Sequence, residues 1–409
     1  MADLADDITR MVLSNLPVKS LLRLKCVSKS WRCWISSPNL QLSNQRRGGA
    51  IVRLMSKYTF CKMSSLRPSF GLINQQLTFE SLNYTFWERG EIPIESCMIL
   101  GSCHGLILIS LDLNVFLWNP ATRFCTKVLQ LPDVFKEDDH HFIISYGELC
   151  FDSSKNDYKL VMFSYNSLAS TEFVLVASLK DKEWKRIQFP HDIRDGITFQ
   201  GRLHYMIKIK KPYKNDEIDY YEAGREDRFG PRNNITYFDP IYEKFHMFPV
   251  PVPNPNPKSL QQDDNIIVGL GVLNECLCMT RLECNDVEIL VMKEYGVKDS
   301  WTSLFFIRNL EIDPSFGVAH PFSLNENGEL ALIIDKGRVI VYNSVNNNTR
   351  DVLDPEETLS IGAITYVESL ISPKEEYSWN DHLHGEPDTI QLLGEQHPHK
   401  KKRFRRRYL

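Results

Sequence analysis

Hydrophobic residues recur at helical spacing most clearly in the first forty residues of the chain. Ile8, Met11 and Val12 lie three or four positions apart and predict a helix that Pro17 ends. A second stripe and a third helix capped by Ser28 are expected to follow, with the apolar residues Val18, Leu21, Leu22, Val27, Trp31, Trp34 and Ile35. Helices this short cannot bury a core alone. Their apolar surface therefore packs either on the rest of the chain or on another protein.

From about residue 50 to residue 372, short apolar segments alternate with turn residues, which is the pattern of an all-β domain. Hairpins with a Gly or Asn turn are predicted at His104–Gly105, Gln200–Gly201, Asn274–Glu275 and Asn327–Gly328. Polar turns recur about 50 to 60 residues apart, near Asn119, Asp181, Asp239, Glu294 and Asn343. This interval is close to the blade period of kelch-type propellers.

Five such units are legible, and a sixth would form if the strand region 51–60 paired with the last strand, 361–367. Joining the two ends of the domain in this way closes a ring and leaves few free sheet edges. We therefore predict a β-propeller of about six blades. A folded-over β-sandwich is the alternative, because Gly and Asn turns occur in any β domain.

The helical segment resembles an F-box. The resemblance is carried by Leu4-Ala5-Asp6-Asp7-Ile8-Thr9, by Val12-Leu13-Ser14-Asn15-Leu16-Pro17-Val18-Lys19-Ser20-Leu21 and by Lys25-Cys26-Val27-Ser28-Lys29-Ser30-Trp31. It implies binding to a Skp-type linker subunit and, through that subunit, to the cullin of an SCF ubiquitin ligase. The contacts that it implies are Leu4, Ile8, Leu16, Pro17, Leu21, Leu22 and Val27.

Two positions depart from the F-box pattern. Ala5 replaces the usual first Pro, and Thr9 replaces the usual second apolar residue. Each lost contact is expected to weaken docking by about 1 kcal/mol, judged from the apolar area that it would bury. We expect linker binding to be retained but weakened.

The β domain resembles the plant F-box-associated region, in the subgroup of immune-regulating and pollen self-incompatibility F-box proteins. The segments that carry this likeness are Cys103-His104-Gly105-Leu106, Leu117-Trp118-Asn119-Pro120-Ala121-Thr122-Arg123, the stretch from Phe151 to Val161, Trp184-Lys185-Arg186-Ile187, Trp301-Thr302 and Tyr366-Val367-Glu368-Ser369-Leu370. The fold class is accordingly α+β and multidomain. We expect a helical F-box over residues 1–45, a kelch-like β domain for substrate recognition over 50–372, and a polar, disordered tail over 373–409.

Composition excludes several classes of function. The formal net charge of −4 argues against general nucleic-acid binding, no apolar run is long enough to span a membrane, and no signal peptide is recognised. The ten scattered cysteines suit reduced thiols in the cytoplasm or nucleus. Cys276, Cys278 and Cys284 cluster, but they lack the spacing of a zinc site, and we expect no metal and no cofactor.

Two polar segments interrupt the β pattern, at 208–234 and 251–264. The first contains tyrosine and arginine side chains, the types that most often anchor protein interfaces. The residues proposed to contact a protein client are Tyr213, Tyr220, Tyr221, Arg225 and Arg228. The alternative is that both segments are solvated insertions without a binding role.

The chain ends in a basic run that can serve as a nuclear-import signal or remain a solvated tail without a reader. Its cationic residues are Lys400, Lys401, Lys402, Arg403, Arg405, Arg406 and Arg407. We expect the protein in the cytoplasm, the nucleus or both.

Three functions remain open from the sequence. The first is a non-catalytic substrate-recognition adaptor of an SCF-type ubiquitin ligase, which docks the linker with its F-box and an unknown protein client with its β domain. The second is a ligase-independent scaffold with an F-box that has degenerated at Ala5 and Thr9. The third is a propeller enzyme, which would require clustered acids or metal ligands at the centre of the ring.

Overall fold

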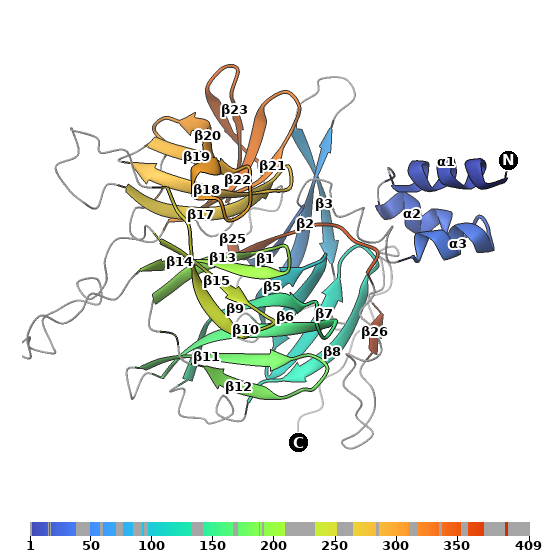
Figure 1. The fold of residues 1–409 in the computed structure, drawn as a ribbon, viewed down its shortest axis with the longest axis horizontal. Coiled ribbons are helices and arrows are strands. Elements are labelled where there is room, and N and C mark those ends of the chain that lie inside the picture. Colours follow the sequence, from blue (N-terminus) through green and yellow to red (C-terminus); the bar gives the residue numbers. More distant parts are fainter. Residues whose placement is uncertain are drawn as a thin grey trace, which may run out of the picture.

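A computed structural model of the chain gives its architecture. It describes residues 2–14, 16, 18–37, 50–57, 60–70, 77–84, 92–93, 97–132, 142–166, 171–187, 189, 192–208, 234–251, 265–283, 286–310, 312, 317–334, 338–352, 359–371 and 389–391. Three short helices come first, and almost everything after them is β-strand (Figure 1). No helix in these ranges is long and apolar enough to cross a membrane.

The helices are α1 (Ala2–Ser14), α2 (Val18–Leu24) and α3 (Lys29–Ile35). The predicted cap of the third helix is confirmed, because the backbone N–H of Trp31 donates to Ser28 Oγ over 3.1 Å. These helices pack on one another through Leu13, Val18, Leu21 and Ile35, which are all buried. We call residues 2–37 the helical head.

The described strands form six antiparallel sheets, five of which are consecutive meanders of four strands. The first meander has β5 (Cys97–Cys103), β6 (Leu106–Leu111), β7 (Asn114–Asn119) and β8 (Phe124–Gln130). The second has β9 (Phe142–Asp152), β10 (Asp157–Asn166), β11 (Thr171–Ser178) and β12 (Trp184–Ile187). The third has β13 (Asp192–Phe199), β14 (Arg202–Lys208), β15 (Asn234–Asp239) and β16 (Lys244–Phe248).

The fourth meander has β17 (Asn265–Leu273), β18 (Cys276–Glu283), β19 (Asp286–Met292) and, after the 3-10 turn η5 (Lys298–Ser300), β20 (Trp301–Ile307). The fifth has β21 (Ala319–Leu324), β22 (Glu329–Ile334), β23 (Arg338–Asn343) and β24 (Asn348–Asp351). The sixth sheet combines β25 (Leu359–Tyr366) with β1 (Ala50–Lys57), β2 (Phe60–Phe70), β3 (Leu77–Tyr84) and β4 (Ile92–Pro93).

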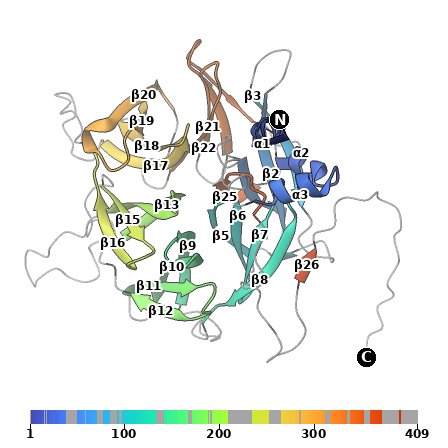
Figure 2. The same ribbon diagram turned by 45° about the vertical axis from the view of Figure 1, so that its right-hand side comes forward.

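The sheets are arranged around a ring, with the first strand of each meander on the inside (Figure 2). Strand β9 contacts β5 and β13, β17 contacts β13 and β21, and β25 contacts β5. This arrangement is a β-propeller of about six blades, as predicted, and it rules out the sandwich alternative. The predicted closure is confirmed as well, because Ile51 of β1 pairs with Thr365 of β25.

The predicted turns lie at equivalent places in the blades. His104 and Gly105, with φ of 51° and 78°, join the first two strands of one blade, and the same position in other blades is occupied by Gln200–Gly201, Asn274–Glu275 and Asn327–Gly328. In the first three of these turns both residues have a positive φ, which matches the twist of a tight hairpin, whereas in the last only Gly328 has one. The second set of predicted turns, near Asn119, Asp181, Asp239, Glu294 and Asn343, joins the third and fourth strands of the blades.

All six sheets share one feature that the sequence did not predict. The pairing of the innermost strand with its neighbour shifts register once in every sheet, at Leu100, Ser145, Arg194, Val268, Phe322 and Ile361. An extra residue of this kind bends a strand and increases its twist. The bulge therefore recurs at the axis of each blade, where the strands bend around the centre of the ring.

The hydrophobic core is divided among the interfaces between successive blades. One cluster joins the blade β5–β8 to β9–β12, another joins β9–β12 to β13–β16, and two more continue toward β21–β24. Inner strands approach very closely at Gly269, where a Cβ atom would lie 1.8 Å from the carbonyl oxygen of Ala319. Glycine is required there by close backbone approach.

The C-terminal tail differs in part from the expectation of disorder. Thr389–Gln391 form a short strand, β26, which pairs antiparallel with the outer edge of β8. The outer edge of a blade offers unpaired backbone groups, and an uncharged segment containing Ile390 is able to pair with them. The rest of 372–409, including the basic run at Lys400–Arg407, lies outside the described residues.

Candidate functional site

Helix α1 exposes an apolar face. Ile8, Met11 and Val12 are 54%, 66% and 52% exposed, while Leu13 on the same helix is completely buried. Val27, which follows α2, is 59% exposed. Large exposed apolar side chains at helical spacing, as on α1, are typical of a protein-interaction site. We call Ile8, Met11 and Val12 the head face.

The residues predicted to bind a linker subunit occupy three kinds of position. Ile8 and Val27 are exposed, whereas Leu16 and Leu22 are half-buried. Leu21 has no exposed surface, because α2 turns it into the core of the helical head. Leu21 therefore belongs to the core of the helical head and is not on its surface.

Two predicted positions cannot be placed. Leu4 lies within α1, but its side chain is not among those described, and Pro17 lies outside the described residues. Conversely, Met11 and Val12 belong to the head face although they were not among the predicted contacts. Their helical spacing from Ile8 was the available signal.

The helical head is seated on the propeller through one leucine from the far end of the β domain. Leu370, only 2% exposed, packs into the same cluster as Leu13, Val18 and Ile35. Ala121, in the turn between β7 and β8, packs against the edge of this cluster. The core of the head is therefore completed by a residue more than 300 positions away along the chain.

Asn119 holds the segment that carries Leu370. Its Nδ2 atom donates to the carbonyl oxygens of Ser369, at 3.1 Å, and Ile371, at 2.5 Å. Its Oδ1 atom accepts the backbone N–H groups of Ala121, at 2.8 Å, and Thr122, at 3.2 Å. One buried amide thus shapes the turn between β7 and β8 and fixes the segment after β25.

Gly105 lies against the same segment. A Cβ atom at this position would come within 2.4 Å of the carbonyl oxygen of Val367 and within 2.5 Å of Ser369 Oγ. The backbone also has a φ of 78°, which side-chain-bearing residues rarely adopt. We call Gly105, Asn119 and residues 367–371 the clasp.

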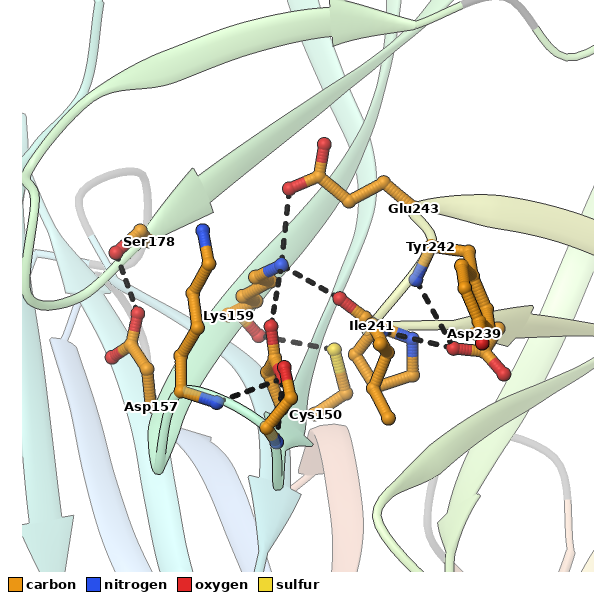
Figure 3. A network of polar contacts seen from close by, with 12 residues as sticks. Cys150, Asp157, Lys159, Ser178, Asp239, Ile241, Tyr242 and Glu243 are labelled. Atoms are coloured by element: carbon orange, nitrogen blue, oxygen red, sulfur yellow. Dashed lines mark hydrogen bonds and ion pairs between the residues drawn. The ribbon is translucent and has the colours of Figure 1, made fainter.

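A buried ion-pair network joins the second and third blades (Figure 3). Lys159 Nζ on β10 lies 3.0 Å from Asp152 Oδ2 and 3.0 Å from Glu243 Oε1, and it donates to the carbonyl oxygen of Pro240 over 2.6 Å. Lys185 pairs with the other oxygen of Glu243 at 2.6 Å. Burial alone would lower the pKa of Lys159, but hydrogen bonding and the charges of Asp152 and Glu243 raise it. The ammonium therefore stays charged between the two blades.

A second polar group lies on the inner strands. The hydroxyl of Tyr146 donates to Glu148 Oε1 over 2.7 Å, and His320 Nε2 lies 2.9 Å from Asp195 Oδ2. Burial raises the pKa of Glu148 to about 8, helped by the charge of Asp195 and opposed by the hydrogen bond from Tyr146. Burial would lower the pKa of His320, but the charge and hydrogen bond of Asp195 raise it.

These inner-strand groups bear on the enzyme hypothesis. Carboxyl, phenol and imidazole groups come together, but the hydrogen bonds they make are with one another, with the hydroxyl of Thr198 and with the backbone of inner strands. Within the described ranges, no three His, Cys, Asp or Glu side chains are arranged to hold a metal ion. Cys276 and Cys278 are free thiols on β18, and Cys284 lies outside the described residues.

The proposed client-contact residues Tyr213, Tyr220, Tyr221, Arg225 and Arg228 all lie outside the described residues. The strands that flank them are described, and their pairing fixes where the two polar segments begin and end. Ile207 pairs with Asn234, and Ile235 pairs with Phe248. Both polar segments therefore leave the third blade from the same end.

Comparison with known proteins agrees with this architecture. The family model for the F-box domain matches residues 1–42, and the model for the F-box associated beta propeller domain matches residues 67–352. F-box protein CPR1 of Arabidopsis thaliana is 27% identical over 354 residues, which cover 81% of this chain and 80% of that protein. An F-box/kelch-repeat protein of the same plant is 24% identical over 381 residues, which cover 89% of this chain and 94% of that protein.

Proposed function

The chain belongs to the plant F-box proteins that carry an F-box associated β-propeller domain, and from this premise we propose that it is the substrate-recognition subunit of an SCF-type ubiquitin ligase. In this role the helical head binds a Skp-type linker subunit, which joins it to a cullin. The propeller holds a protein client. The chain itself performs no chemistry and acts by raising the effective concentration of the client near the ubiquitin carrier.

One observation supports the proposal above all others: the head exposes apolar side chains while its core is fixed to the propeller. Ile8, Met11 and Val12 are more than half exposed and lie outside the cluster that contains Leu370, so they are accessible to a partner. An adaptor requires this combination, because the client is presented to the ligase only if the two binding parts keep a defined relative position.

Binding to the linker subunit tests the proposal. Ile8→Asp and Met11→Asp place charges on the head face and are each expected to weaken co-purification with the linker at least about tenfold, because a buried unpaired charge is costly. Val345→Asp is the matched control, since Val345 is 83% exposed in the turn between β23 and β24. Equal binding by all four proteins would refute the proposal.

The scaffold alternative is tested by restoring the family residues. Ala5→Pro with Thr9→Ile is expected to strengthen linker binding, by about 1 kcal/mol for each restored contact. Absence of binding both before and after this change would favour a ligase-independent scaffold. The adaptor and scaffold hypotheses also predict different fates for the client protein. Removing this chain should make the client accumulate only if the chain is a ligase adaptor.

We place client recognition on the first polar segment, where tyrosine and arginine side chains are concentrated. Deletion of residues 212–232 is expected to abolish client binding and to leave linker binding unchanged. Loss of both activities would indicate misfolding and would contradict this placement.

Nuclear entry through the basic run is proposed as well. A fluorescent fusion lacking residues 400–409 should then shift toward the cytoplasm, and an unchanged distribution would argue against the signal.

A further inference from the structure

Strand β20 is unlike the outermost strands of the other blades. Strands β12, β16 and β24 have four or five residues and carry the charged or polar side chains Lys185, Arg186, Lys244, His246, Arg350 and Asp351. The edge of β8 is covered by β26, and β3 contains Glu80. Short length, charge and covering are the usual ways of protecting a sheet edge from pairing with other chains.

β20 has none of these protections. It is seven residues long, and its sequence from Trp301 to Ile307 contains no charged residue. Among the described strands it pairs only with β19, so no described strand covers its other edge. Leu304 and Phe306 are 40% and 47% exposed on it. A long, uncharged, apolar edge of this kind favours pairing with a further strand.

The bulge in β20 does not shield this edge. The register shift between Ile289 and Leu290 leaves Leu304 as the extra residue of β20. Bulges protect an edge when they twist it away or turn a charge outward. Here the residue at the bulge is an exposed leucine, which adds apolar surface to the edge.

Exposed charged side chains flank the strand on both sides. Lys298 and Asp299, in the turn η5, precede β20, and Arg308 follows it. In an antiparallel pair of two copies, the beginning of one strand lies beside the end of the other. Asp299 of each copy would then face Arg308 of the second copy, at both ends of the paired strands. Opposite charges across an antiparallel pair stabilise it.

From these observations we propose that β20 is a self-association edge, through which two copies of this chain pair antiparallel and join two four-stranded blades into one eight-stranded sheet. The first blade of this propeller already pairs its outer strand with a further strand, since β26 adds to β8. β20 lies on the far side of the ring from α1–α3 (Figures 1 and 2), so both helical heads remain accessible in the dimer.

The association should be weak. Pairing of two seven-residue strands buries less than the roughly 1,200–2,000 Å² of a standard stable interface, so a dissociation constant in about the micromolar range is expected. Sedimentation of the full-length chain over a range of concentrations measures it. The expected result is a mass that rises to twice the monomer value as the concentration increases.

Substitutions identify the edge. Phe306→Lys introduces a charge on β20 and should raise the dissociation constant at least about tenfold. Val345→Lys, at an exposed position of another blade, should leave it unchanged. Asp299→Arg and Arg308→Asp should each weaken the dimer, and the double exchange should restore it, because it re-creates both opposite-charge pairs. All these side chains are exposed, so the melting temperature should be the same in every variant.

Several results would overturn the proposal: a monomer at every concentration, a dimer that Phe306→Lys leaves intact, or a double exchange that does not recover association. A monomer that loses a bound client on Phe306→Lys would show that the edge receives an extended client segment and not a second copy. The measurement is independent of linker binding, so its failure leaves the proposed adaptor function standing.

Discussion

At the scale of single residues, Leu370 has the clearest consequence, because it belongs to the β domain by sequence and to the helical head by packing. Leu370→Ala removes buried methyl groups and leaves a cavity, which should destabilise the head by about 2–4 kcal/mol. The measurement is amide hydrogen exchange of α1–α3 together with the affinity for the linker subunit. Exchange should accelerate and affinity should fall, while amides of β9–β12 remain protected.

Leu304→Ala is the matched control for this prediction. It removes the same atoms from a half-exposed leucine across the ring, where surface substitutions usually change stability by less than about 0.5 kcal/mol. Unchanged exchange of the helices in Leu370→Ala would show that the head folds without the propeller and would contradict the role assigned to the clasp.

Glu148 makes stability depend on pH. In the unfolded chain its carboxyl loses the proton near its ordinary pKa of 4.5, whereas the folded protein holds the proton up to about pH 8. Between these values the folded state binds more protons, so the free energy of unfolding falls as pH rises. Glu148→Gln keeps a neutral side chain at every pH. The melting temperature of this variant should be several degrees above that of the wild type at pH 8 and nearly equal to it at pH 4.

Other groups set the limits of this pH test. His320 contributes a fall in stability in the same direction above pH 6.5, because Asp195 raises its pKa against the effect of burial. The smaller rise that the charge of Glu148 adds to the pKa of His320 is absent from Glu148→Gln. Glu326→Gln, the same substitution at an exposed position, provides the control for the change of side chain itself. If the melting temperatures of wild type and Glu148→Gln changed with pH in the same way from pH 4 to pH 8, Glu148 would not retain its proton in the folded state as proposed.

At the scale of elements, the network around Lys159 ties β10 to the turn between β15 and β16. Lys159→Met leaves Asp152 buried without its cation and should destabilise the protein by about 3–5 kcal/mol, because an uncompensated buried charge is costly. Lys185→Met removes a cation from the same Glu243, but Lys185 is largely exposed, and a loss of at most about 1 kcal/mol is expected. Chemical unfolding of the two variants gives the comparison, and equal losses would refute the distinction.

The elements also show how far the sequence leads. Turns are predictable because they need special backbone conformations, and side chains such as Asn119 and Asp239 satisfy the turn locally through their Oδ1 atoms. The bulges near the ring axis left no such signal in the sequence, because one extra residue hardly changes the pattern of apolar residues along a strand. The partners of Lys159 were equally hidden, because Glu243 is 84 positions away and only the ring brings it near.

The same reasoning separates the two parts of the candidate site. The head face followed from helical spacing, a local property of Ile8, Met11 and Val12. The clasp could not be predicted, because the side chain that completes the head core, Leu370, becomes its neighbour only when β25 closes the ring. Burial of Leu21 was likewise decided by packing among three helices, which a linear pattern does not fix.

At the scale of the whole molecule, two attachments of the head to the ring meet at one sheet. The covalent connection leads from α3 to β1, and the contact with Leu370 comes just after β25, while Ala121 adds a contact from the turn between β7 and β8. Because β1 and β25 pair with each other, both attachments depend on the same closed sheet. We therefore expect that opening the ring also impairs the head.

Truncation tests this coupling of closure and docking. A chain ending at residue 358 lacks both β25 and Leu370, and it should lose most of its linker affinity and become sensitive to proteolysis in β1–β3. A chain ending at residue 371 keeps β25 and the clasp and should bind the linker as the full chain does. If the shorter chain is poorly soluble, adding a peptide of residues 359–371 in trans should recover linker binding. Full linker affinity in the chain ending at 358, without the peptide, would mean that the head and the ring fold independently.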